Sequence, residues 1–433
     1  MADALTTQPD DSTEMQIQSV SLDEVVTTVV MARVTDFFGF FVYAIASALV
    51  FPTIFFPFLD PVQGTMAAFA LFALAFIVRP FASMAGRKLQ KKIGKIGKIS
   101  GALFLLGTAT VAIGLLPGYE QIGWLAPALL AGLRILQGIG LGGAWDGITL
   151  QLQNAAPKHR KGLYAMVPQL GGPIGFIVAG SLFYVLTGFL TPDEFMNYGW
   201  RFAFFAVLAV NIVSLFARLR LLQTDFGADP HTFKSAPFVE MVRTQWRPVV
   251  LSTMMPLASY ALFHMVTVFP LAYATLYTPE IAIDYILLLQ FIGGVIAAFT
   301  VVLSGVLADR YHKRSVLWTS IALIPLLCLT LPSLDTNPAL YILFGFAVLG
   351  LAYGQASAIV PNRYPPRFRY SGTALSTNLS WIVGAAFAPL VGLTLTAWFG
   401  IWAMALYLLS GVAVTAVALV LLGRIKKHEV SSA

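Results

Sequence analysis

Charged side chains are scarce in this 433-residue chain: 11% of its residues are Asp, Glu, Lys or Arg, and 58% are hydrophobic. A soluble domain carries about 25% charged residues. The composition and the mean hydropathy of +0.79 therefore exclude an ordinary soluble protein and indicate a chain that crosses a membrane many times. Its single cysteine, Cys328, excludes a disulfide framework.

Catalytic patterns are also missing. The chain has no HExxH motif, no cysteine–histidine set and no pair of acids on one predicted helix. An enzyme needs a nucleophile with a base, or a set of metal ligands, at one depth. We therefore expect no catalytic residues, no metal site and no cofactor.

Long apolar runs take the place of the missing charge. They are about 20 residues long or longer and do not alternate between apolar and polar residues, so helices are predicted and not a barrel. Twelve spans are expected, over residues 27–57, 63–86, 97–117, 122–153, 161–188, 199–221, 248–276, 282–308, 314–332, 338–361, 371–397 and 400–423. The sequence thus predicts an all-α polytopic membrane protein.

Basic residues gather in every second connection between these spans. The other connections hold Asp60, Glu120, Asp193, Glu194, Glu280, Asp284 and Asp335, with Arg201 as their one basic residue. Because Lys and Arg favour cytoplasmic loops, this asymmetry predicts that both termini are cytoplasmic. Residues 1–25 lack the basic start and cleavage site of a signal peptide. We interpret the net charge of +7 as an orientation signal facing anionic lipid, and no nucleic-acid partner is expected.

The longest interior linker, residues 222–247, divides the spans into two halves. The predicted organisation is a tail over 1–25, six helices over 26–221, the cytoplasmic linker, six helices over 248–424 and a second tail over 425–433. Each half has a basic connection between its second and third spans, at 86–98 and 304–314. Two related six-helix halves are typical of secondary transporters.

Several motifs resemble those of the major facilitator superfamily, and within it the metabolite:proton symporter family of shikimate, alpha-ketoglutarate, citrate and proline/betaine permeases. The loop signature GxxxDRxGRR is matched by Gly305, Asp309, Arg310, Lys313 and Arg314, with His312 in place of the second glycine. Further matches are DFFGF at 36–40 with Tyr43 and FFP at 55–57, Arg79-Pro80, RILQGIGLGGA at 134–144, PQLGGPIGF at 168–176, GWR at 199–201, and RYSG at 369–372 with Asn378. The resemblance implies two pseudo-symmetric six-helix bundles in a bacterial inner (plasma) membrane.

Four positions depart from the family pattern. Lys91 replaces the acid of the first loop signature, Gly39 replaces an acid of the first helix, and Ala144 replaces a glutamate, with Asp146 two residues later. In the family these acids hold the cytoplasmic gate. Gating is therefore assigned to Lys91, Asp146, Asp309, Arg310 and Arg314, with Asp309 as the principal lock. The alternative for Lys91 is a loop that binds anionic lipid.

Arg134 lies about ten residues into a predicted span, where an isolated charge costs about 2.5–3.5 kcal/mol. Helical spacing puts Gln137 on its face. One hypothesis makes Arg134 a bidentate anchor for a substrate carboxylate, or a basic partner that tunes a proton-carrying acid. The alternative is a buried arginine satisfied by carbonyl groups or by an acid of a neighbouring helix, which only holds the bundle together.

Two residues are candidates for proton coupling. Asp36 lies in the first third of its span, and burial would favour its protonated form; the alternative is an ion pair with Arg33, three residues earlier. His264 shares a polar stripe with Tyr260 and Thr267 and titrates near neutral pH. Its alternative is a neutral, hydrogen-bonded histidine.

The predicted function is secondary active transport by alternating access, with proton-coupled uptake of a small organic acid or zwitterion by a monomer. Alternatives are an uncoupled facilitator, an efflux antiporter and a transporter-derived sensor. The residues expected to line the substrate site are Tyr43, Arg134, Gln137, Gln169, Tyr260, His264, Asn378 and Trp381.

Overall fold

A computed structural model describes residues 22–144, 152, 156–223, 238–356, 360 and 364–431. These residues form helices and no strand. Up to the predicted linker, the helices are α1 (Leu22–Leu49), α2 (Phe51–Phe55), α3 (Pro61–Leu115), α4 (Tyr119–Ile122), α5 (Leu125–Gly143), η1 (Lys158–Arg160), α7 (Lys161–Met166), η2 (Val167–Leu170), α8 (Gly171–Phe189), α9 (Pro192–Glu194), η3 (Phe195–Gly199) and α10 (Arg201–Gln223).

The second half begins inside the predicted linker. Its helices are α11 (Phe238–Met254), α12 (Leu257–Thr267), α13 (Phe269–Tyr277), α14 (Ile283–Tyr311), α15 (Lys313–Cys328), η4 (Leu331–Leu334), α16 (Pro338–Gly354), α17 (Pro366–Ser380), η6 (Trp381–Ala386), α18 (Ala388–Phe399) and α19 (Trp402–Ser431).

Eight helical segments of the described chain are long and apolar enough to cross a membrane, and two bent pairs raise that number to ten. Two further helices, α15 with 16 residues and α16 with 17, are shorter than the 18 residues of that test. With them, the described segments account for the twelve predicted spans. The all-α prediction is confirmed.

The second and third spans of each half are joined by the same backbone geometry. Gly94 interrupts α3 with φ of 75°, and His312 separates α14 from α15 with φ of 73°. Both are the second-glycine position of the loop signature, 218 residues apart. His312 is the one non-glycine residue of the described chain with positive φ. Because this region strongly favours glycine, His312 is strained.

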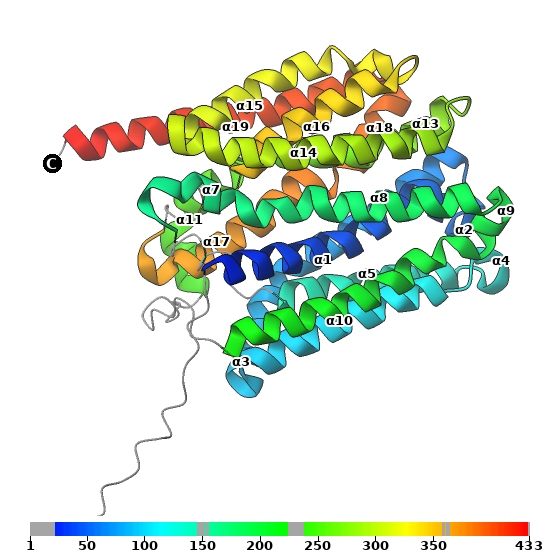
Figure 1. The fold of residues 1–433 in the computed structure, drawn as a ribbon, viewed down its shortest axis with the longest axis horizontal. Coiled ribbons are helices and arrows are strands. Elements are labelled where there is room, and N and C mark those ends of the chain that lie inside the picture. The colour runs from blue at the N-terminus through cyan, green and yellow to red at the C-terminus, as the bar shows by residue number, and fades with distance from the viewer. Residues whose placement is uncertain are drawn as a thin grey trace, which may run out of the picture.

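The helices run side by side along the bundle in two groups (Figure 1). In the first half α3 packs on α5 and α10, and α1 packs on α8 and α10; in the second half α14 packs on α16, and α15 on α16 and α19. The halves meet where α8 contacts α14 and where α3 contacts α17, η6 and α18. This interface places residues of both halves at the centre of the molecule.

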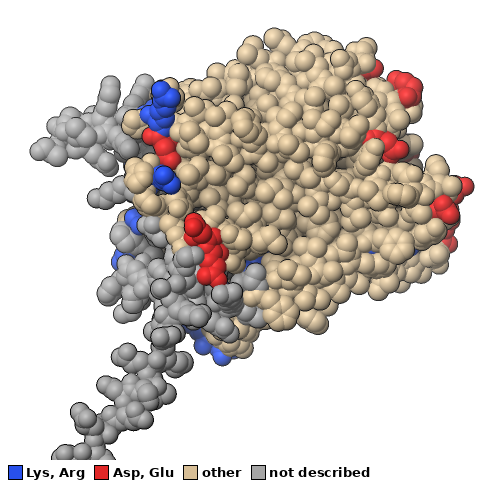
Figure 2. Space-filling model, in the orientation of Figure 1, with Lys and Arg blue, Asp and Glu red and all other residues tan. Residues whose placement is uncertain are grey.

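α1 begins and α19 ends at the same end of the bundle, which we call the terminal end (Figure 1). On the face shown in Figure 2, blue Lys and Arg side chains gather at that end together with some red acidic ones, and acidic side chains mark the opposite end. The space between is almost free of charge, as expected for a surface that faces lipid. Which end faces the cytoplasm stays a prediction.

Candidate functional site

A cluster of aromatic side chains fills the centre of the interface between the halves. We call it the central cluster; its members are Phe37, Phe40, Phe41, Phe72, Phe76, Tyr260, Phe263, His264, Tyr353 and Trp381. Neighbouring rings lie close together, with the Tyr260 and Trp381 centroids 4.6 Å apart. Because the rings come from α1 and α3 in one half and from α12, α16 and η6 in the other, any separation of the halves must open this cluster.

His264 is the most unusual member of the central cluster. Its side chain is fully buried, and its ring centroid lies 5.3 Å from that of Phe40, 5.2 Å from Phe72 and 5.2 Å from Phe263. Neither ring nitrogen has a hydrogen-bond partner among the described residues. A buried polar group without a partner costs free energy. His264 is therefore not the hydrogen-bonded histidine that the sequence offered as an alternative.

Arg134, by contrast, is well satisfied inside the first half. Its Nη1 donates to Gln137 Oε1 at 2.7 Å and its Nη2 to the Phe72 carbonyl at 2.7 Å. The guanidinium carbon lies 3.7 Å from the centre of the Tyr43 ring, which is a cation–π contact. Gln137 donates onward to Thr110 Oγ1 at 2.8 Å. These contacts support the structural interpretation of Arg134, which joins α5 to α3 and α1.

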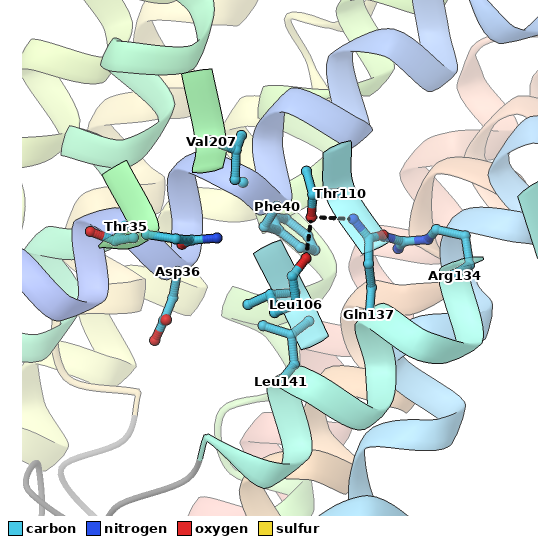
Figure 3. A pocket seen from close by; sticks show the side chains of 11 residues that line it. Thr35, Asp36, Phe40, Leu106, Thr110, Arg134, Gln137, Leu141 and Val207 are labelled. Carbon is cyan, nitrogen blue, oxygen red and sulfur yellow. Dashed lines mark hydrogen bonds between the residues drawn. The ribbon is translucent and has the colours of Figure 1, made fainter. Parts of the chain in front are cut away.

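A small pocket lies beside this network, between α1, α3, α5 and α10, and both polar and apolar side chains line it. Figure 3 shows Gln137 and Thr110 pointing toward each other on one side of it, with Asp36 on the other. Gly39, which replaces a family acid, lines the pocket, and a Cβ there would stand 2.9 Å from Val207 Cγ1. An acidic side chain at position 39 would therefore have to displace the Val207 side chain of α10.

Asp36 is held by two arginines. Arg218 Nη2 donates to its Oδ1 at 2.6 Å, and Arg33 Nη1 approaches its Oδ2 at 3.5 Å. Arg218 also donates to the Ala32 carbonyl at 2.9 Å. The ion pair with Arg33 is confirmed. The sequence analysis missed Arg218, although it stands inside the predicted span 199–221, where an arginine is itself a signal.

Asp309 bridges the two halves at the terminal end. Its Oδ1 accepts from the Gly162 amide at 2.5 Å and its Oδ2 from the Leu163 amide at 3.0 Å. Gln355 of α16 adds a bond to the Gly162 carbonyl at 3.2 Å. The acid therefore caps the helical run that begins at Lys161, where amide groups favour negative charge. At the opposite end Thr187 of α8 donates to Asp284 of α14 at 2.6 Å.

The other predicted gating residues do not join this contact. Lys91 and Arg310 are exposed. Arg314 Nη2 donates to the Leu419 carbonyl at 2.7 Å, which is a bond within the second half. Asp146 lies outside the described residues. The acid-to-lysine change at 91 therefore leaves Asp309 without a carboxylate counterpart at the matching position of the first half.

The predicted substrate residues fall into two groups. Tyr43, Arg134 and Gln137 are packed within the first half, whereas Tyr260, His264 and Trp381 belong to the central cluster. Asn378, buried on α17 three residues before Trp381, has no partner for its Oδ1 among the described residues, and Gln169 is buried in η2. Sequence analysis missed Phe263 and Tyr353 because nothing but tertiary contact distinguishes them from other apolar positions.

Comparison with known proteins identifies the family to which this architecture belongs. The family model described as Major Facilitator Superfamily matches residues 122–380. The chain is 35% identical to the inner membrane metabolite transport protein YhjE of Escherichia coli (strain K12), over 93% of this chain and 94% of that protein. It is 28% identical to the shikimate transporter of the same strain, over 90% and 92% of the two chains.

The fold has solved counterparts as well. The crystal structure of a D-xylose-proton symporter superposes with a TM-score of 0.70 at 15% identity, over 92% of this chain and 97% of that one. At this identity the likeness shows the fold alone. Together with the family match and the 35% identical relative, it accounts for the two six-helix bundles. The chain belongs to the major facilitator superfamily and is a membrane transporter of metabolites, not an enzyme.

Proposed function

We propose that the protein is a secondary active transporter that takes up a small organic acid or zwitterion together with a proton. One observation carries this proposal: the interface between the halves encloses buried polar groups without partners, His264 foremost. A substrate that supplies hydrogen bonds to such groups gains binding energy that water cannot compete for in a closed centre.

The contacts around this centre support alternating access. Asp309 with Gly162 closes the terminal end, and Thr187 with Asp284 closes the opposite end. Each contact joins the two halves, so rocking of one half against the other breaks one contact while the other persists. The central cluster lies between them and would open to each side in turn.

Similar proteins support the proposed substrate class and the coupling. One similar protein is named a shikimate transporter. Another, at 26% identity, is named the proline/betaine transporter of Escherichia coli (strain K12). A protein with a similar fold is a D-xylose-proton symporter. We propose the bacterial inner membrane as the location, cytoplasmic termini, and a monomer as the working unit. Asp36 and His264 are the candidate proton-binding groups, and Arg134 serves to hold α1, α3 and α5 together.

Uptake into proteoliposomes tests the proposal. Radiolabelled shikimate and glycine betaine are offered with and without an inward proton gradient, and accumulation above equilibrium is expected only with the gradient. Uptake that ignores collapse of the gradient would establish facilitated diffusion instead. Arg134→Ala should lower the amount of folded protein, whereas loss of substrate affinity in the folded fraction would restore its role as an anchor.

A further inference from the structure

Two arginines lie one helical turn from aromatic residues of the central cluster, on the side of the terminal end. On α1, Arg33 lies four residues before Phe37, whose ring centroid is 5.9 Å from that of Phe263. On α3, Arg79 lies three residues after Phe76, whose ring centroid is 5.9 Å from that of Trp381. Residues three or four apart share one face of a helix. Both arginines therefore stand on faces turned toward the other half.

The second half presents two hydroxyl groups at the same level. Tyr260 of α12 and Tyr353 of α16 are buried, and their ring centroids lie 6.1 Å apart. Both tyrosines interact electrostatically with Arg33 and Arg79. Tyr353 Oη lies close to Arg33 but forms no hydrogen bond of good geometry with any described residue. Two guanidinium groups of one half thus face two phenol groups of the other.

The described residues provide few carboxylates at this level of the interface. Within the described residues, Asp36 is the one carboxylate that interacts with Arg79, and it is already held by Arg218 at 2.6 Å and by Arg33 at 3.5 Å. Arg79 has no hydrogen bond and no ion pair with any described residue. Arg79 thus has no carboxylate of its own among the described residues, and a cation in a low-dielectric interior needs a counter-charge.

We propose that Arg33 and Arg79 bind the carboxylate of an anionic organic substrate between the two halves, with hydroxyl donors from Tyr260 and Tyr353. This inference rests on the proposed transport function and narrows its substrate class from acid or zwitterion to anion. A zwitterion would also need a counter-charge for its cationic group. The described residues offer there only Asp36, which two arginines already hold.

Calorimetric titration of the full chain in nanodiscs tests the site. The anionic probes are shikimate, citrate and alpha-ketoglutarate; the others are the neutral methyl ester of shikimate, proline and glycine betaine. An anion should bind at least about 10-fold more tightly than the zwitterions, and, if it is shikimate, than its ester, because a hydrogen bond to a charged group contributes about 1.5–3 kcal/mol. This comparison uses the unaltered protein and so does not depend on a variant that folds.

Variants then test whether the two arginines bind the anion. Arg79→Gln and Arg33→Gln should each weaken anion binding about 10- to 100-fold, and Arg79→Lys should restore part of it. Arg201→Gln is the matched control, because Arg201 donates to the Gly114 and Leu116 carbonyls at the opposite end of the bundle. Unchanged anion affinity in folded Arg79→Gln would overturn the site.

The possible outcomes distinguish failure of the anion site from failure of the proposed transport function. Binding and gradient-driven uptake of betaine or proline, without any anion, would overturn the anion site and leave the proposed function standing. Absence of both binding and uptake for every probe would overturn the proposed function as well. Anion binding that is lost in both Arg→Gln variants and kept in the control would establish the site.

Discussion

Neutralising Asp309 should open the terminal end of the protein. In Asp309→Asn the amide keeps one acceptor oxygen for Gly162 or Leu163, loses the negative charge and turns its NH₂ group toward the other backbone N–H. Bonds of this charge-assisted kind contribute about 1.5–3 kcal/mol. Because Asp309 is exposed, water replaces much of what is lost, and we expect about 1 kcal/mol, or about a fivefold shift toward the open state.

A buried serine provides the reporter for this shift. Ser304 on α14 is fully buried beside Gln355, at a distance of 3.4 Å between its Oγ and Nε2 of the amide. With the free and buried Cys328 replaced by alanine, Ser304→Cys becomes the one thiol. Its maleimide labelling rate in nanodiscs follows the population of the open state. Adding Asp309→Asn should raise that rate about fivefold.

A matched change elsewhere on the same end controls for loss of charge. Glu240 forms an exposed ion pair with Arg367 at 2.5 Å, and both residues lie in the second half. Exposed pairs contribute about 0–1 kcal/mol and this one does not cross the interface. Glu240→Gln should leave the labelling rate unchanged. A rate in Asp309→Asn equal to that of its parent would refute the assignment of Asp309 as the lock.

Three further substitutions test the packing around the site through thermal unfolding followed by tryptophan fluorescence. Arg218→Gln should lower the free energy of unfolding by about 2 kcal/mol, because it leaves the partly buried Asp36 carboxylate without its 2.6 Å partner. His312→Gly should raise it by about 1 kcal/mol by relieving a positive φ. Gly142→Ala should lower it by about 1–3 kcal/mol, because the added methyl group collides with the Arg79 carbonyl oxygen.

Each of these has its own check. Asp36→Asn added to Arg218→Gln should recover part of the stability, and additive losses would show that the two side chains are not coupled. Gly101→Ala is the control for Gly142, since nothing lies within 4 Å of a Cβ there; equal effects at both glycines would remove the packing argument. A less stable His312→Gly would mean that the histidine side chain contributes more than its backbone costs.

The sequence alone determined the fold class. Apolar runs of membrane-spanning length can only be helices in lipid, because every backbone group must find its partner within the span. The loop signature also located the two equivalent turns, which the structure shows at Gly94 and His312 with the same positive φ. Helical spacing also offered the pairing of Asp36 with Arg33 as one of two alternatives, since residues three apart lie on one face.

Only the tertiary structure decided what each buried charge contacts. The sequence could put Arg134 inside a span, but whether it faced a cavity or two carbonyl groups of α3 depended on how α5 packs on that helix. Arg218 on α10 and Asp36 on α1 lie 182 residues apart in the chain and meet because α1 packs on α10. Spacing predicts contacts along one helix, whereas contacts between helices depend on packing geometry that no local pattern encodes.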